Sequence, residues 1–208
     1  MNTIRGIVFD MDGVLIDARE WHYEALNMAL KLFGLSISME EHLSEFDGLP
    51  TREKLLRLTA RNELPLSLHP FINEMKQHYT LQMIHQHCWP TFIHQQTLAV
   101  LKHTGYQIAV ASNSISDSIE AMLGRARLLP YLDFYLSNED VICGKPDPEI
   151  YLKAFSRMQL RPEECVVVED NPHGIAAARS AGAHVLAVAG PQDVTLETVQ
   201  SFIQRCES

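Results

Sequence analysis

Residues 8–17 read Val-Phe-Asp-Met-Asp-Gly-Val-Leu-Ile-Asp. An apolar run ends at Phe9, and two carboxylates, Asp10 and Asp12, follow it directly. Residues 6–9, Gly-Ile-Val-Phe, are continuously apolar, which is typical of a strand that is buried on both faces, and we predict this strand over residues 4–9. Gly13 then allows the chain to turn. Two acids at one strand end repel each other unless a cation or a proton separates them. Because Mg²⁺ prefers carboxylate oxygens as ligands, this pattern predicts a magnesium site at the end of the first strand.

Four later apolar runs also predict strands, and helical patterns separate most of them. The predicted strands are residues 107–111, 134–136, 165–168 and 184–188. The predicted helices are residues 116–124, 148–158 and 174–180. Apolar strands that alternate with helices indicate a parallel sheet built from βαβ units. We therefore predict an α/β fold, a Rossmann-like doubly wound parallel sheet whose functional residues follow the carboxyl ends of its strands.

The connection between the first two predicted strands is much longer than a crossover helix requires, which is only about a dozen residues. It carries apolar residues at helical spacing, first at Trp21, Ala25, Met28, Ala29 and Leu32. We therefore interpret residues 18–88 as a small α-helical domain. This domain is inserted into a Rossmann-like core made of residues 1–17 and 89–208.

Composition and charge exclude several classes of protein. The net charge of −9 argues against a nucleic-acid partner, because nucleic-acid binders normally present a basic face. No segment reaches the ~18 apolar residues of a membrane span, so we expect no membrane partner. The N-terminal residues lack the apolar region of a signal peptide, and the four cysteines form no CxxC pair. These features favour reduced thiols and a cytoplasmic location, and we expect a monomer or a weak dimer.

Three later segments place more polar residues at predicted strand ends. Residues 109–113, Ala-Val-Ala-Ser-Asn, supply a hydroxyl and neighbouring N–H groups that can hold a phosphoryl oxygen. Residues 143–148, Cys-Gly-Lys-Pro-Asp-Pro, place a lysine in a loop that two prolines stiffen. Residues 166–170, Val-Val-Val-Glu-Asp, end an apolar strand in two adjacent acids.

These four motifs, in this order, resemble those of the haloacid dehalogenase (HAD) superfamily, and the resemblance covers essentially the whole chain. It implies that Asp10 is a nucleophile and that Asp12 is a general acid and base. Dehalogenases of the superfamily lack the second aspartate, so Asp12 favours phosphate chemistry over carbon–halogen cleavage. The resemblance therefore implies a phosphatase, a phosphoric monoester hydrolase.

The remaining motifs acquire roles through the same resemblance. Ser112 and Asn113 are expected to bind the transferring phosphoryl group, Asn113 through its backbone N–H. Lys145 is expected to take part in catalysis and substrate binding by offsetting the negative charge of the phosphoryl group and the nucleophile. The implied cofactor is Mg²⁺. Its implied ligands are Asp10, Asp12 through its backbone carbonyl, Asp170, and Glu169 either directly or through water.

The helical insertion resembles the cap of one branch of the superfamily, that of the β-phosphoglucomutase-like sugar-phosphate phosphatases. By that match His22 and Arg52 are expected to bind the substrate. Hinges are expected near residues 17–18 and 88–90. Phosphonoacetaldehyde hydrolases use a cap lysine that forms a Schiff base, but Arg52 occupies the corresponding loop here and cannot form one.

We therefore expect a magnesium-dependent phosphohydrolase that acts on a small phosphorylated metabolite, such as a sugar phosphate, through an aspartyl-phosphate on Asp10. The alternative enzyme is a mutase of the β-phosphoglucomutase type, which returns the phosphoryl group to a sugar hydroxyl. The four motifs do not separate the two, because the choice depends on water exclusion. A catalytically silent scaffold would lack some of the motif residues. This chain has all of them: Asp10, Asp12, Lys145 and Asp170.

Overall fold

The computed structural model describes residues 3–61 and 63–208, and the chain divides into two compact units. The core unit consists of Met1–Asp17 and Trp89–Ser208, and the cap unit is Ala18–Cys88. The described strands all belong to the core unit, and the regular elements described in the cap unit are helices.

A five-stranded parallel sheet forms the centre of the core unit, with the strand order β3-β2-β1-β4-β5. Its strands are β1 (Gly6–Phe9), β2 (Gln107–Ala111), β3 (Phe134–Leu136), β4 (Cys165–Glu169) and β5 (His184–Ala187). Every strand predicted from an apolar run is present. The first begins two residues later than expected, and the last ends one residue earlier. The predicted α/β fold with a Rossmann-like parallel sheet is confirmed.

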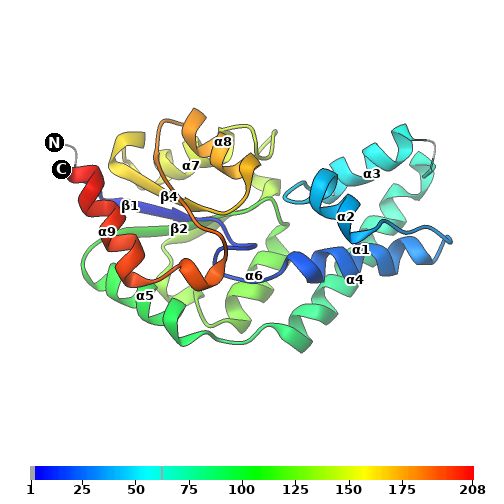
Figure 1. Ribbon diagram of the computed structural model, residues 1–208, viewed down its shortest axis with the longest axis horizontal. Coiled ribbons are helices and arrows are strands. Elements are labelled where there is room, and N and C mark those ends of the chain that lie inside the picture. Colours follow the sequence, from blue (N-terminus) through cyan, green and yellow to red (C-terminus); the bar gives the residue numbers. More distant parts are fainter. Residues whose placement is uncertain (1–2, 62) are drawn as a thin grey trace. The chain divides into compact units, whose positions relative to one another are not determined.

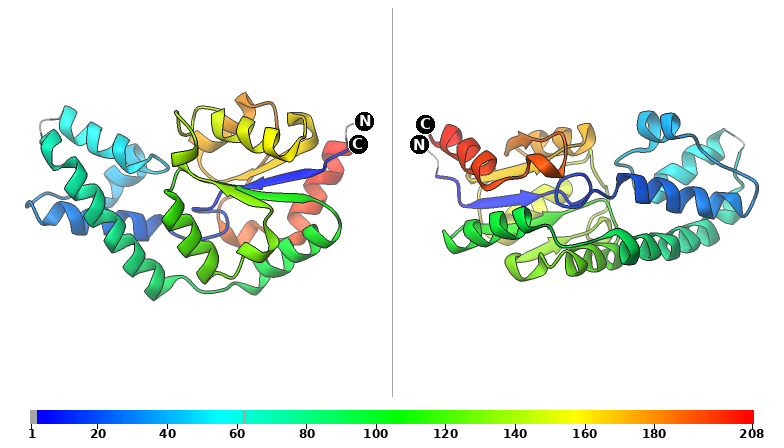
Figure 2. Two further views of the ribbon diagram at one scale, coloured as in Figure 1. Left: turned by 180° about the vertical axis from the view of Figure 1, so that it is seen from behind. Right: turned by 60° about the horizontal axis from the view of Figure 1, so that its bottom comes forward.

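Helices cover both faces of the sheet (Figure 1; Figure 2). Helices α7 (Glu149–Met158) and α8 (Pro172–Ser180) lie on one face. Helices α5 (Phe92–His103), α6 (Ser116–Arg125) and α9 (Leu196–Glu207) lie on the other. This is the doubly wound arrangement. None of the helices within residues 3–61 and 63–208 has the length and apolar character that a membrane crossing requires.

The two helical layers explain why the strand sequences are apolar along their whole length. Val8 on β1 packs into a cluster with Tyr151 and Phe155 of α7, whereas its neighbours Ile7 and Phe9 point to the opposite face. All five side chains are buried. Removing an aliphatic or aromatic side chain of this size from water stabilises the fold by about 1.5–3 kcal/mol.

The cap unit has a hydrophobic core of its own, where α1 (Arg19–Lys31) packs against α4 (His69–His87). The apolar residues that α1 buries are Ala25, Leu26, Ala29 and Leu30. The stripe predicted from the sequence was therefore partly wrong. Leu32 follows the last residue of the helix and is 51% exposed. The face of α1 that packs in the cap core carries Leu26 and Leu30 instead.

A buried asparagine fixes the segment that follows α1. The side chain of Asn27 donates to the carbonyl of Ile37 at 3.0 Å and accepts from its N–H at 2.9 Å. Both polar groups of Ile37 are thus satisfied without a strand partner. Helix α2 (Met39–Glu41) begins two residues after this fixed point, a π-helical turn (His42–Phe46) continues it, and α3 (Thr51–Ala60) follows.

Candidate active site

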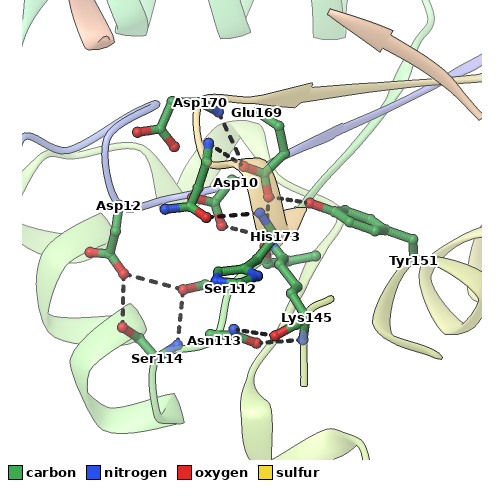
Figure 3. A network of polar contacts seen from close by, with 12 residues as sticks. Asp10, Asp12, Ser112, Asn113, Ser114, Lys145, Tyr151, Glu169, Asp170 and His173 are labelled. Atoms are coloured by element: carbon green, nitrogen blue, oxygen red, sulfur yellow. Dashed lines mark hydrogen bonds and ion pairs between the residues drawn. The ribbon is translucent and has the colours of Figure 1, made fainter. Parts of the chain in front are cut away.

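The polar residues of the four motifs meet at the carboxyl ends of three neighbouring strands (Figure 3). Asp10 follows β1, Ser112 follows β2, and Glu169 ends β4. The hydrogen-bond ladder continues past the strands: the N–H of Asp10 donates to Val168 at 2.9 Å, and that of Ser112 donates to Leu136 at 3.0 Å. These bonds hold the functional side chains on rigid backbone.

Lys145 joins two of the acids. Its Nζ lies 2.6 Å from Oδ1 of Asp10, 2.6 Å from Oε1 of Glu169 and 2.8 Å from the carbonyl oxygen of Ala111. An ammonium has three protons, so these contacts use all of its donors. The Lys145 side chain is buried, with Nζ 4.9 Å from the centre of the Tyr151 ring. The lysine therefore has one defined position beside Asp10.

The side chain of Asn113 forms two hydrogen bonds with the backbone of Lys145 and so fixes the loop that carries the lysine. Its Oδ1 accepts from the N–H of Lys145 at 3.0 Å, and its Nδ2 donates to the carbonyl of Lys145 at 3.3 Å. The carbonyl of Asn113 in turn accepts from Nδ2 of Asn138 at 2.7 Å. Asn113 thus positions Lys145 through its side chain. Phosphoryl binding by its backbone N–H stays a prediction.

Glu169 accepts hydrogen bonds at both carboxylate oxygens. Oε1 accepts from Lys145 at 2.6 Å and from the hydroxyl of Tyr151 at 2.6 Å. Oε2 accepts from the N–H groups of Asp170 and Asn171 at 3.1 and 3.2 Å. A carboxylate has about four lone-pair positions, so these four donors saturate Glu169. Direct metal coordination by this residue, or a hydrogen bond from a metal-bound water, would require one of these bonds to break, so metal contact by Glu169 stays a prediction.

Three carboxylates gather around the lysine. Oxygens of Asp10, Glu169 and Asp170 lie within 4.8 Å of one another. Burial raises the pKa of Asp10 well above its usual range, and the charges of Glu169 and Asp12 raise it further. Burial disfavours the charged form of Lys145, but the Asp10 and Glu169 carboxylates outweigh it and raise the lysine pKa. One ammonium does not balance these acids, and their hard oxygen donors fit Mg²⁺.

Two glycines make room for the acidic side chains. Gly13 has a φ of +87°, and a Cβ placed there would lie 2.1 Å from Oδ2 of Asp170. A Cβ at Gly174, in the first turn of α8, would lie 1.7 Å from Oε1 of Glu169. A side chain at either position would displace the neighbouring carboxylate.

The Asp12 carboxylate contacts a pair of serines. Its Oδ2 accepts from Oγ of Ser114 at 2.8 Å and from Oγ of Ser112 at 3.4 Å. Its side chain is not one of the three that form the acidic cluster. The predicted roles of Asp12, as a general acid and base and as a metal ligand through its carbonyl, stay predictions.

The predicted substrate-binding residues of the cap unit lie in two different settings. His22 on α1 places Nδ1 3.3 Å from Nζ of Lys76 on α4. Arg52 on α3 is exposed, whereas Lys54, two residues later, is 6% exposed. The resemblance points to Arg52, whose role in substrate binding stays a prediction, and the described residues of the cap unit include two buried lysines, Lys54 and Lys76.

A further titratable group of the cap unit, His42, is completely buried. Within the described residues neither ring nitrogen makes a hydrogen bond, and Nε2 lies 3.8 Å from Oδ1 of Asp47. Burial, followed by the charges of neighbouring cations, lowers the pKa of His42 to about 3. Those cations are Lys54, His22, Arg19 and Lys76.

The sequence motifs did not reveal two residues of this network. Ser114 follows the second motif by two residues and reads as an ordinary loop serine, although its spacing from Ser112 offered a weak signal. Tyr151 lies in the apolar stripe of α7 and reads as a core aromatic. Its hydroxyl gains a role only because the fold brings Glu169 within 2.6 Å.

Comparison with known proteins identifies the family. The sequence matches the family described as haloacid dehalogenase-like hydrolase over residues 7–188. The phosphorylated carbohydrates phosphatase of Thermotoga maritima is 31% identical over 182 residues, which cover 86% of this chain and 82% of the relative. Fructose-1-phosphate phosphatase YqaB of Escherichia coli is 31% identical over 179 residues, which cover 85% of this chain and 92% of the relative.

The fold comparison agrees. The crystal structure of β-phosphoglucomutase from Clostridium difficile matches with a TM-score of 0.85 over 98% of both chains, at 23% identity. At that identity the likeness shows the fold alone. The two relatives named above are phosphatases, which confirms the predicted class of enzyme, a HAD-like phosphatase. Because the matched region covers well over half of the chain and includes all four motifs, this chain belongs to the haloacid dehalogenase-like hydrolase family.

Proposed function

We propose that this chain is a magnesium-dependent phosphatase that hydrolyses a small phosphorylated metabolite, most suitably a sugar phosphate, through an aspartyl-phosphate on Asp10. The observation that carries the proposal is the buried contact of 2.6 Å between Asp10 Oδ1 and Lys145 Nζ beside two further carboxylates. This arrangement suits a carboxylate nucleophile that must approach a negatively charged phosphoryl group.

The chemistry divides among the residues of the core unit. Asp10 attacks phosphorus while Ser112 binds a phosphoryl oxygen. Lys145, beside Asp10, attracts the phosphoryl group and offsets its negative charge, and Asp12 protonates the leaving alcohol. Asp12 then removes a proton from the water that hydrolyses the aspartyl-phosphate. Magnesium, when bound, would supply positive charge that offsets the carboxylates and the phosphoryl oxygens together. Asp10, Asp170 and the carbonyl of Asp12 would hold the ion, with Glu169 contacting it directly or through water.

The substrate class rests on the relatives. One relative is named a phosphorylated carbohydrates phosphatase and another a fructose-1-phosphate phosphatase. Arg52 and His22 keep their proposed role in binding the rest of the substrate. A guanidinium suits a second anionic group or several hydroxyls. Arg52→Ala should therefore raise KM more than it lowers kcat.

The mutase alternative is not favoured. The relatives at 31% identity are phosphatases, whereas β-phosphoglucomutase matches at 23% and supports only the fold. Hydrolysis requires water to reach the aspartyl-phosphate, and a mutase must exclude it. The two therefore differ in where the phosphoryl group goes.

The test is a panel of phosphorylated metabolites assayed for free phosphate, with and without Mg²⁺, for the wild-type chain and Asp10→Asn. Phosphate release that requires both Mg²⁺ and Asp10 supports the proposal and identifies the substrate class. The panel includes β-glucose 1-phosphate with a trace of the 1,6-bisphosphate. Glucose 6-phosphate formed with little free phosphate would assign a mutase instead. No turnover of any member would refute the proposed activity.

A further inference from the structure

Two serines donate hydrogen bonds to the same oxygen of Asp12 (Figure 3). Oδ2 accepts from Ser114 Oγ at 2.8 Å and from Ser112 Oγ at 3.4 Å. The N–H of Ser114 also donates to the hydroxyl oxygen of Ser112 at 3.0 Å. The three residues form one network at the ends of β1 and β2, and the contact from Ser114 to Asp12 is the shorter of the two.

The two hydroxyls cannot serve the same purpose during the reaction. A serine hydroxyl has a single proton to donate. Ser112 is the residue proposed to bind a phosphoryl oxygen, and it is 1% exposed. Once its proton points to the phosphoryl group, Ser112 no longer donates to Asp12. Of the two serines, Ser114 is then the one that still holds the Asp12 carboxylate.

Ser114 is itself held in place by backbone contacts. Its carbonyl accepts from the N–H of Asn138, just after β3, at 3.1 Å, and its N–H is bound by Ser112. Helix α6 begins two residues later, at Ser116. A hydroxyl on backbone that is fixed from both sides can orient a carboxylate with little loss of conformational entropy.

From this geometry we propose that Ser114 is a positioning residue that orients Asp12 for proton transfer. The inference rests on the proposed function. As the Asp10–phosphorus bond forms and the ester bond breaks, Asp12 gives its proton to the leaving oxygen. As water then bonds to phosphorus and the Asp10–phosphorus bond breaks, Asp12 takes a proton from that water. By holding Oδ2, Ser114 fixes the orientation in which Asp12 gives and takes the proton.

The experiment compares Ser114→Ala with the wild type on two kinds of ester. An alkyl phosphate needs a proton on its leaving oxygen, whereas p-nitrophenyl phosphate releases a stable phenolate that does not. The quantity measured is kcat/KM, which covers only the steps up to release of the alcohol. The later action of Asp12 as a base therefore does not enter. Ser114→Thr restores the hydroxyl, and Ser116→Ala removes a nearby serine hydroxyl outside this network.

We expect Ser114→Ala to lower kcat/KM for the alkyl phosphate by about 10- to 100-fold, less than the full effect of general acid catalysis because Asp12 itself remains, and for p-nitrophenyl phosphate by less than about 2-fold. Ser114→Thr should recover most of the loss, and Ser116→Ala should show none. Equal losses on both esters, or no loss, would overturn the inference while the wild-type activity upholds the proposed function. A wild-type chain inactive on every ester would overturn the proposed function, and the inference with it.

Discussion

The hydroxyl of Tyr151 donates a hydrogen bond of 2.6 Å to Oε1 of Glu169, and both side chains are buried at the end of β4 (Figure 3). Lys145 donates to the same oxygen at 2.6 Å. A tyrosine from α7 thus fixes the orientation of a carboxylate in the acidic cluster. Partners of this kind around a metal site typically change metal affinity by 10- to 100-fold when they are removed.

Tyr151→Phe should therefore weaken Mg²⁺ binding by about 10-fold, because Glu169 loses one of the donors that orient it. Stability should fall by about 1–3 kcal/mol, the usual effect of losing a hydrogen bond to a charged group. Calorimetric titration with Mg²⁺ measures the first effect and urea unfolding the second. Tyr135→Phe, which removes a half-buried hydroxyl on β3, is the matched control. Equal Mg²⁺ affinity in the wild type and both variants would contradict the prediction.

Addition of Mg²⁺ should raise the thermal stability of the protein. The three carboxylates lie within 4.8 Å of one another, and binding a divalent cation to the folded state relieves their repulsion. At a Mg²⁺ concentration about 100 times Kd the gain is about 2.7 kcal/mol, or several degrees in Tm for a chain of this size. Differential scanning calorimetry with Mg²⁺ and with EDTA measures the shift. Asp170→Asn should reduce it, and an equal shift from sodium chloride at matched ionic strength would argue against a specific site.

Gly13→Ala should impair metal binding, whereas Gly105→Ala should not. Both glycines have positive φ, +87° and +97°, so each substitution strains the backbone by about 1–3 kcal/mol. A Cβ at Gly13 would lie 2.1 Å from Oδ2 of Asp170, but a Cβ at Gly105 meets nothing within 4 Å. Gly105→Ala therefore controls for the backbone strain, and any larger loss of stability in Gly13→Ala, measured by urea unfolding, comes from the displaced carboxylate. If Gly13→Ala bound Mg²⁺ as tightly as Gly105→Ala, the space that Gly13 leaves for the Asp170 carboxylate would not be required for metal binding.

The core unit shows why the sheet could be predicted from the sequence. Strands such as β1 and β4 are covered on both faces, so their burial appears directly as continuous apolar runs. The acids at their ends interrupt these runs abruptly and mark the carboxyl edge. Asp10 and Lys145 are 135 residues apart in the sequence, and only the strand order of the folded sheet brings them within 2.6 Å. The motif resemblance placed both residues in one site, but their spacing alone could not.

The features that the sequence did not reveal depend on three-dimensional packing. The apolar stripe of α1 was misread at Leu32, because the pattern does not show which side meets α4. Lys54 is buried and Arg52 is exposed, a difference that the sequence of this loop does not show; the role of Arg52 in substrate binding stays a prediction. Ser114 gains its contact with Asp12 only when the ends of β1 and β2 lie side by side. Local residue patterns contain no information of this kind.

Acid should destabilise the cap unit through His42. Burial, aided by nearby cations, lowers the pKa of His42 to about 3 from an ordinary value of 6.5. Between about pH 3 and pH 6.5, His42 is therefore protonated in the unfolded chain but neutral in the folded chain. The contribution of His42 to the free energy of unfolding is therefore fully present above pH 6.5 and is lost as the pH falls, by up to about 1.4 kcal/mol per pH unit.

Urea unfolding from pH 8 to 4 measures this loss, with Trp21 fluorescence in a Trp89→Phe background reporting the cap unit. His42→Phe should flatten the profile without loss at pH 8, because neither ring nitrogen has a hydrogen-bond partner within the described residues. A profile as steep as that of the wild type would show that other groups cause the acid sensitivity.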